Sequence, residues 1–250
     1  MTKAIKWTLM MILSAALCAP IAAQQVPGSG KYDSRILNEV QSYLQGNKSL
    51  SNVHATVQQG VVTLTGSVGL YYDKANAEQK IRREDHVAGV RDDVAVTSSV
   101  PDEQLQNKLA EKLRYDHTYP GTVFNSFSLD VSNGVVTLSG STRTYASKDS
   151  AVNLVETTPG VKELIDKVKV DPVSSFDDAI RFRVARAVYG RLPIYANDPQ
   201  DPIRIVVANG NVALDGVVNS QVDKQVAFMA ASEVPGVFRV TNNLAVSSGK

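Results

Sequence analysis

The sequence predicts an α+β protein made of three tandem α-β-β-α-β two-layer sandwich domains, each a three-stranded mixed sheet with two helices. Three observations predict this fold: a seven-residue block that occurs three times, a helical spacing of apolar residues before each block, and an alternating apolar segment after it. The chain has 250 residues, of which 43% are hydrophobic and 20% are charged. This composition is typical of folded domains and excludes a collagen-like or wholly disordered chain.

Three copies of one unit organise the chain. The block Gly-Val-Val-Thr-Leu-Thr-Gly recurs almost unchanged and then in a looser form, at offsets of 74 and 76 residues. The three blocks occupy residues 60–66, 134–140 and 210–216. Self-similarity at a nearly fixed spacing indicates repeated domains. After a linker at 24–30, we therefore expect domains at 31–98, 99–172 and 173–248.

Each copy begins with a predicted helix. Its apolar residues recur at i, i+4 and i+8, which places them on one helical face. They are Ile36, Val40 and Leu44, then Leu105, Leu109 and Leu113, and finally Ile180, Val184 and Val188. An aspartate stands three residues before each first apolar position, at Asp33, Asp102 and Asp177. Because a carboxylate can accept hydrogen bonds from the free N–H groups of a helix start, we expect these aspartates to cap the helices.

A β-hairpin and a second helix follow in each copy. Period-two apolar residues flank the turn pairs Gln59-Gly60, Asn133-Gly134 and Asn209-Gly210, and Asn-Gly is a strong hairpin signal. The second helix is expected at about 72–83, 146–156 and 222–232, followed by the last strand. A β-α-β connection makes that strand parallel to the second strand of the hairpin. Both helices then cover one face of the sheet.

These motifs resemble the BON domain of bacterial osmotically inducible periplasmic and nodulation-associated proteins. The resemblance is carried by the repeated block, the second helix and a Gly-Val-x-x-Val-x-Asn-x-Leu tail, which is clearest at 236–244. It implies an α-β-β-α-β fold in the cell envelope, no catalysis, and association with phospholipid surfaces or envelope proteins. His86 replaces the tail glycine in the first copy, and 162–166 is a loose version in the second. These departures leave the tail turn open.

The N-terminus has the features of a secretory signal peptide. Two lysines precede an apolar run at 7–17, and small residues up to Ala23 form a cleavage site. We expect a signal peptide at 1–23, a periplasmic mature chain, and a net charge of −1 in place of the +1 of the full sequence. Cleavage would remove Cys18, the single cysteine, so no disulfide is expected. An uncleaved anchor and a lipidated Cys18 are the alternatives.

The residue patterns do not predict catalysis. His54, His86 and His117 have no His or Cys partner four residues away, so zinc-type spacing is absent. The adjacent carboxylates Asp92 and Asp93 point to opposite faces of a strand, and no serine lies in a Gly-x-Ser-x-Gly elbow. The nearly neutral charge does not favour nucleic acid. We therefore expect no enzyme, no cofactor, no metal site and no nucleic-acid partner.

Comparison among the copies makes the first helix of the third domain the candidate binding site. Phe182 and Tyr189 stand where the other copies have polar residues, and about 100° per residue places both opposite Ile180. The arginines around them are Arg181, Arg183, Arg186 and Arg191. Aromatic rings interleaved with arginines suit an anionic membrane interface. Partner contact, packing on the preceding domain and simple exposure are the alternatives.

The sequence thus predicts a non-enzymatic periplasmic binding protein, peripheral to the membrane, that contacts anionic phospholipid headgroups and supports envelope integrity or osmotic stress tolerance. The alternative is a protein–protein scaffold or chaperone-like module for envelope or secreted proteins. Weak self-association is left open. The aromatic loop at 115–124 either folds over a sheet edge or forms a partner-binding rim. The recurring lysines Lys74, Lys148 and Lys224 are expected to be solvated and are assigned no role.

Overall fold

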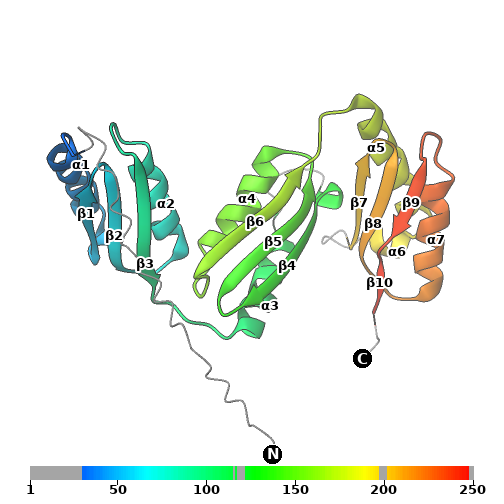
Figure 1. Ribbon diagram of the computed structural model, residues 1–250. Helices are drawn as coiled ribbons and strands as arrows, with labels where there is room; N and C mark the ends of the chain where they lie inside the picture. The colour runs from blue at the N-terminus through cyan, green and yellow to red at the C-terminus, as the bar shows by residue number, and fades with distance from the viewer. Residues whose placement is uncertain (1–29, 115, 117–121, 197–201, 248–250) are drawn as a thin grey trace, which may run out of the picture.

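The structure, a computed structural model, describes residues 30–114, 116, 122–196 and 202–247. Three modules follow one another along the chain (Figure 1). The expected signal peptide, with Cys18, lies outside the described residues.

Each module has the predicted order of elements. The first consists of α1 (Asp33–Gly46), the 3-10 turn η1 (Lys48–Leu50), β1 (Val53–Gln58), β2 (Val61–Val68), α2 (Tyr71–Arg82) and β3 (Gly89–Val96). The second consists of α3 (Asp102–Arg114), η2 (Thr122–Phe124), β4 (Ser126–Ser132), β5 (Val135–Thr142), α4 (Tyr145–Glu156) and β6 (Glu163–Val170). The third consists of α5 (Ser175–Arg191), α6 (Pro193–Ala196), β7 (Ile203–Ala208), β8 (Asn211–Val218), α7 (Gln221–Ser232), β9 (Arg239–Asn242) and β10 (Ala245–Val246).

The three sheets share one topology, and it confirms the α+β prediction. In each module the first two strands pair antiparallel, and the third strand pairs parallel with the central one. Helices cover one face of each sheet (Figure 1). The third module differs in its last strand, which is interrupted between β9 and β10. There the Asn243 side chain donates to Asp215 Oδ1 at 2.9 Å.

Each module has its own apolar core beneath its helices. The predicted helical stripes form this core, since Ile36, Leu105 and Ile180 are each at most 1% exposed. The second positions of the stripes are buried as well. In the second module the stripe ends early, because Leu113 is half-buried and packs at the margin of the cluster.

The predicted capping aspartates instead hold the hairpin turn of their own module. In the first module, the Asp33 carboxylate accepts hydrogen bonds from the backbone N–H groups of Gln59 and Gly60, both at 2.8 Å. Asp102 and Asp177 hold their turns in the same way, at 2.7 to 2.9 Å. The capping prediction is therefore wrong: each carboxylate reaches across to the turn. We call this contact the aspartate clamp.

The turn conformation explains why a carboxylate is needed there. Gln59, Asn133 and Asn209 have φ between 51° and 54°, and the glycines after them have φ between 72° and 80°. Two central residues with positive φ define the two-residue hairpin turn that matches the strand twist. Their N–H groups lie beyond the last ladder bonds, and a buried N–H without a partner is costly. The two oxygens of one carboxylate satisfy both.

A second glycine fixes the far end of each hairpin. Gly66 has a φ of 111°, and a Cβ there would lie 2.0 Å from the carbonyl oxygen of Asn52. A Cβ at Gly140 or Gly216 would likewise lie 2.0 Å from a backbone carbonyl oxygen. Both glycines of the repeated block are therefore required by backbone geometry.

The turn before the last strand keeps its conformation in the first module, although His86 stands there in place of glycine. His86 takes the left-handed conformation with a φ of 67°, where the other modules have glycine. Its ring stacks on Tyr32, with 3.8 Å between centroids and 5° between planes. The stacking offsets part of the backbone cost of a side chain at positive φ.

Side chains cap the outer edge of the last strand. Thr97 donates its N–H to the Val68 carbonyl at 2.9 Å, so the odd-numbered residues of β3 form the backbone hydrogen bonds with β2. The backbone N–H and C=O of Val94 therefore point to the outer edge of the sheet, while its side chain lies in the core. Asp92 Oδ1 accepts the outward N–H of Val94 at 3.0 Å, and Lys74 Nζ donates to the Val94 carbonyl at 2.7 Å. These side chains occupy backbone groups to which another strand would otherwise pair.

The same edge capping recurs in the other modules. In the second, Asp166 Oδ1 accepts the N–H of Val168 at 2.9 Å, and Lys148 Nζ donates to the Val168 carbonyl at 2.8 Å. In the third, Asn242 replaces the aspartate, and its Oδ1 accepts from Leu244 N at 3.2 Å. The expectation of solvated lysines is wrong for Lys74 and Lys148, whose side chains are only 23% and 24% exposed.

The first prediction concerns the aspartate clamp. Asp33→Ala removes two charge-assisted hydrogen bonds and leaves two turn N–H groups without their carboxylate, which is expected to lower the free energy of unfolding by about 2 to 3 kcal/mol. Urea unfolding of the purified protein measures this. Ser34→Ala, at an exposed neighbour, is the control and should change the value by less than about 0.5 kcal/mol. Equal stability of the two variants would contradict the role of the clamp.

The second prediction concerns Asp92. Its side chain is 7% exposed, Oδ2 has no hydrogen-bond partner, and Lys74 Nζ is 3.8 Å from Oδ1. Burial raises the pKa of Asp92, so the ionised carboxylate costs stability as the pH rises through the folded-state pKa. Asp92→Asn introduces the residue of the third module and is expected to raise the free energy of unfolding at neutral pH.

The gain from Asp92→Asn should shrink as the pH falls and should vanish below the unfolded-state pKa of about 3.9, where the wild-type carboxyl is protonated in both states. Unfolding curves between acidic and neutral pH check this. A gain that grows on acidification would contradict the prediction. Asp166→Asn is the matched control: it removes a 2.8 Å ion pair with Lys148 and should bring no gain.

Candidate functional site

Arg181 is buried between two modules, although the sequence analysis placed it on an outward face of α5. Its side chain is 2% exposed; Nη1 donates to Asp178 at 2.7 Å and Nη2 to Asp171 at 3.0 Å. Nη2 also donates to the Val207 carbonyl at 2.5 Å. Asp171 belongs to the end of the second module, where its N–H donates to the Thr142 carbonyl. Arg181 therefore joins the third module to the second.

Phe182 contributes to the same joint. Its ring meets Phe124 edge-on, with 5.3 Å between centroids and 85° between planes. The Arg143 guanidinium lies 5.5 and 5.8 Å from the two ring centroids, and its Nη2 is 3.0 Å from Asp178 Oδ1. Phe182 thus packs on the preceding module, as one alternative of the sequence analysis stated, while 54% of its surface stays exposed.

Tyr189 and Arg191 also make contacts within the protein. Tyr189 is half-buried against the third core, and its hydroxyl donates to the Ile203 carbonyl at 2.7 Å and accepts from Ile203 N at 3.3 Å. Arg191 forms an ion pair with Glu233 on the surface, and this pairing lowers the pKa of Glu233. The prediction that Tyr189 faces outward is wrong, because the ring leans onto the start of β7.

Three exposed residues of the predicted site lie together on one stretch of α5. Phe182, Arg183 and Arg186 are exposed, and Arg183 Nε donates to the Ala179 carbonyl of its own helix at 3.1 Å. Spacings of three and four residues make these side chains neighbours on the helix surface. We call these three residues the α5 surface.

Phe124 is a joint residue that the sequence analysis did not assign. It is 3% exposed and belongs to the core cluster of the third module, although it lies in the second. Helix η2, at the described end of the loop at 115–124, lies against β7 of the third module. Tyr115, His117 and Tyr119 of that loop lie outside the described residues.

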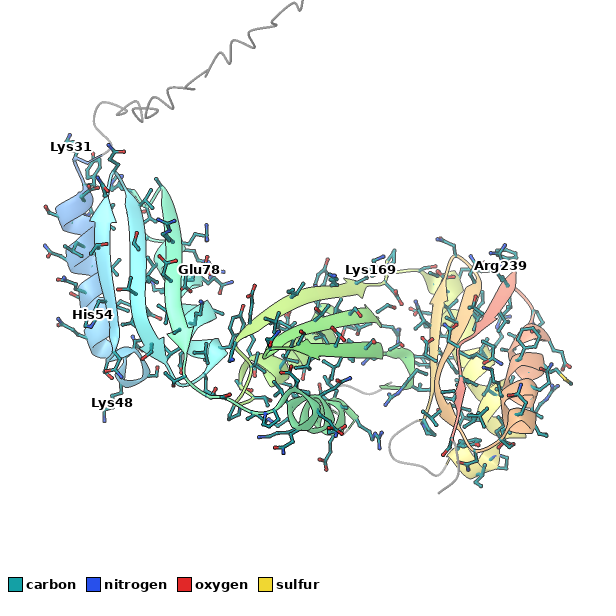
Figure 2. The ribbon with its side chains drawn as sticks, turned by 60° about the horizontal axis from the view of Figure 1, so that its bottom comes forward. Lys31, Lys48, His54, Glu78, Lys169 and Arg239 are labelled. Carbon is teal, nitrogen blue, oxygen red and sulfur yellow. The ribbon has the colours of Figure 1, made fainter. Side chains whose placement is uncertain are left out.

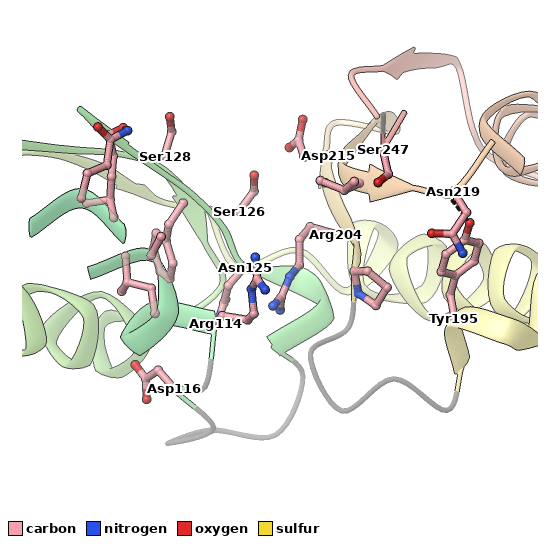
Figure 3. Close-up of a pocket in the computed structure, with 18 of the residues that line it drawn as sticks. Arg114, Asp116, Asn125, Ser126, Ser128, Tyr195, Arg204, Asp215, Asn219 and Ser247 are labelled. Carbon is pink, nitrogen blue, oxygen red and sulfur yellow. Dashed lines mark hydrogen bonds between the residues drawn. The ribbon is translucent and has the colours of Figure 1, made fainter. Parts of the chain in front are cut away.

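A cleft of about 850 Å³ separates the second and third modules on one side of the joint (Figure 3). Helix α3 and the edge strand β4 form one wall, with Arg114 and Asn125, and the start of β7 contributes Arg204 to the other. At the far end, the Tyr195 hydroxyl accepts from Asn219 N at 2.6 Å. The sequence analysis assigned no role to these residues, and we assign the cleft no ligand.

The described residues contain neither a metal-ligating cluster nor a membrane-spanning helix. Over 30–114, 122–196 and 202–247, no three His, Cys, Asp or Glu side chains come together in a way that could hold a metal ion. Within those same stretches, none of the helices combines the length and apolar character needed to cross a bilayer. The chemistry available on α5 is that of an exposed ring and two guanidinium groups, which suits anionic and aromatic ligands.

Comparisons with known proteins identify the class of the modules. The sequence matches the BON domain at residues 32–98, 101–172 and 181–248. The chain therefore belongs to the BON domain family, as three tandem copies. A search of curated proteins finds no match.

Two solved structures are similar at a low level. One is CdsD, a structural protein of the type III secretion system of Chlamydia trachomatis, with 18% identity and a TM-score of 0.25 over 86% of this chain and 94% of that one. The other is the periplasmic domain of the type III secretion inner membrane protein PrgH from S. typhimurium, with 13% identity and a TM-score of 0.22 over 84% and 100%. TM-scores this low say nothing about function.

The third prediction concerns the joint. Arg181→Gln, which introduces the residue that the second module has at this position (Gln106), leaves the Asp171 carboxylate 9% exposed and without its cation. Breaking a buried ion pair in this way typically costs about 3 to 5 kcal/mol. We expect a loss of that size in urea unfolding and faster cleavage by protease near Val173, which is 99% exposed. The exposed control Arg183→Gln should leave both readouts unchanged, and equal behaviour of the two variants would contradict the joint.

Proposed function

We propose that this protein is a non-enzymatic periplasmic protein that binds anionic phospholipid headgroups and supports envelope integrity or osmotic stress tolerance. Membership of the BON family over three modules supports an envelope module without catalysis. The observation that carries the lipid assignment is the α5 surface, where an exposed ring lies beside two exposed arginines. Arg181 and Tyr189 act inside the protein and are not part of the proposed contact.

The composition of the α5 surface sets the strength of the contact. An arginine near an anionic leaflet contributes about 1 kcal/mol, and burial of a phenyl ring contributes about 1.5 to 3 kcal/mol. Phe182 already gives part of its surface to Phe124, which places its contribution at the low end. Two arginines and a ring at the low end sum to about 3.5 kcal/mol before the cost of association, so one site binds no more tightly than about millimolar. Firm attachment then requires several molecules or modules at once.

The fourth prediction tests the lipid contact with vesicles. Phe182→Asn with Arg186→Glu introduces residues that the other first helices have at these positions, Asn38, Asn107 and Glu111. The repeated fold accepts these residues on a first helix, but Phe182→Asn also removes the ring contact with Phe124 at the joint, so urea unfolding of the double variant accompanies the binding assay. We expect wild-type protein to co-sediment with vesicles that contain phosphatidylglycerol, in an amount that falls as salt is added. The double variant should bind at least about tenfold more weakly.

The control for this experiment is Lys167→Glu, which reverses one exposed charge on β6 of the second module. It should retain most of the wild-type binding. Equal recovery of wild type and double variant would contradict the site. Wild-type protein that fails to sediment with anionic vesicles, or binds neutral vesicles equally well, would contradict the proposed function itself.

A further inference from the structure

The first module is docked on the second through a tyrosine. Tyr71, the first residue of α2, is half-buried and packs against the apolar cluster of the second module. Burial raises the pKa of its hydroxyl, and a hydrogen bond with the backbone of Leu164 partly opposes that rise. The contact therefore joins a helix start of one module to the last strand of the next.

Leu164 is suited to this contact by its place on the strand. Asp171 donates its N–H to the Thr142 carbonyl at 2.8 Å, so the odd-numbered residues of β6 face β5. The N–H of Leu164 therefore points away from the sheet, at an edge where Val168 is already capped. Tyr71 thus contacts the backbone of Leu164, an edge position to which the capping side chains form no hydrogen bond.

The two parts of this docking contact recur in other modules without touching each other: the tyrosine in the second module and the strand position in the third. Tyr145, the first residue of α4, corresponds to Tyr71 and is 74% exposed. Val240 corresponds to Leu164, because each pairs with the second residue of its central strand. The Arg181 joint fixes the third module against the second by other contacts. Tyr145 is consequently left in solvent.

The surface beside Val240 is more apolar than its counterparts. Phe238 is 75% exposed and lies 6.4 Å from the ring of Phe176, which is 49% exposed. The same position holds Ala88 in the first module and Lys162 in the second, as the shared bond to the turn glycine carbonyl shows. Arg239, next to Phe238, stands exposed at one end of the third module (Figure 2). Exposed apolar groups gathered around a polar edge are typical of an interaction site.

We propose that Tyr145 of one copy docks on the edge around Val240 in the third module of a second copy, as Tyr71 docks on Leu164 within the chain. The partner is a second copy because this chain carries both complementary surfaces. A tyrosine ring beside Phe238 and Arg239 also gains aromatic and cation–π contacts. Reciprocal docking of two copies closes the contact into a symmetric dimer. This proposal does not depend on lipid binding.

The fifth prediction uses sedimentation velocity on the purified protein without lipid. Wild-type protein is expected to shift from monomer to dimer as its concentration rises. Tyr145→Gln, which introduces the third-module residue Gln221, and Phe238→Lys, which introduces the second-module residue Lys162, should each weaken dimerisation by about tenfold or more. Val222→Ser removes a side chain that is 70% exposed on α7 and should leave dimerisation unchanged.

A cysteine experiment locates the contact. In a Cys18→Ser background, Tyr145→Cys and Arg239→Cys are placed in separate chains, mixed and oxidised. Since each chain carries one cysteine, a mixed disulfide can only join two copies, and it should form faster than with the control pair Val222→Cys and Arg239→Cys. A wild-type protein that stays monomeric, a dimer unaffected by Tyr145→Gln, or equal cross-linking of both pairs would overturn the proposal.

Discussion

One carboxylate in each module connects the first helix to the hairpin turn, and the rest of the module is arranged around that contact. Apolar packing alone holds a helix on a sheet without fixing its position along the strands, because the hydrophobic effect is not directional. The aspartate clamp adds two charge-assisted hydrogen bonds of defined geometry. In modules of about 70 residues, where the core is small, such a contact sets the register of the helix. The three modules keep it although their surfaces differ.

The two joints between modules are built from different chemistry. Tyr71 and the margin of an apolar cluster hold the first module on the second. The second joint uses a buried arginine with carboxylates from both modules, together with the Phe124 and Phe182 rings. A buried ion pair is sensitive to geometry and is costly to break, so it fixes orientation more strictly than an apolar contact. The three modules share one fold, but each therefore has different contacts with its neighbours.

The sequence predicted the fold of each module because that fold depends on local periodicity and on turn glycines. The stripe at Ile180, Val184 and Val188 and the Asn209-Gly210 turn could be found without knowing any neighbour. Arg181 could not, since a helical wheel assumes one buried face, whereas α5 packs on its own sheet and on the second module. Its partner Asp171 lies ten residues earlier in a segment without periodicity. The aspartates were recognised as important, but their contact lies 26 to 33 residues away.

The capped edges explain how the chain adds one module to another without merging sheets. A free last strand would pair with any other exposed strand. In each module the side chain of Asp92, Asp166 or Asn242 accepts a hydrogen bond from an outward-pointing N–H of the last strand. That N–H can then no longer pair with another strand. The beginning of the last strand stays accessible, and in the second module Tyr71 forms a hydrogen bond with the backbone there, at Leu164. Contacts between modules then depend on one side chain and its surroundings, so a few substitutions at these positions suffice to give each copy a different neighbour.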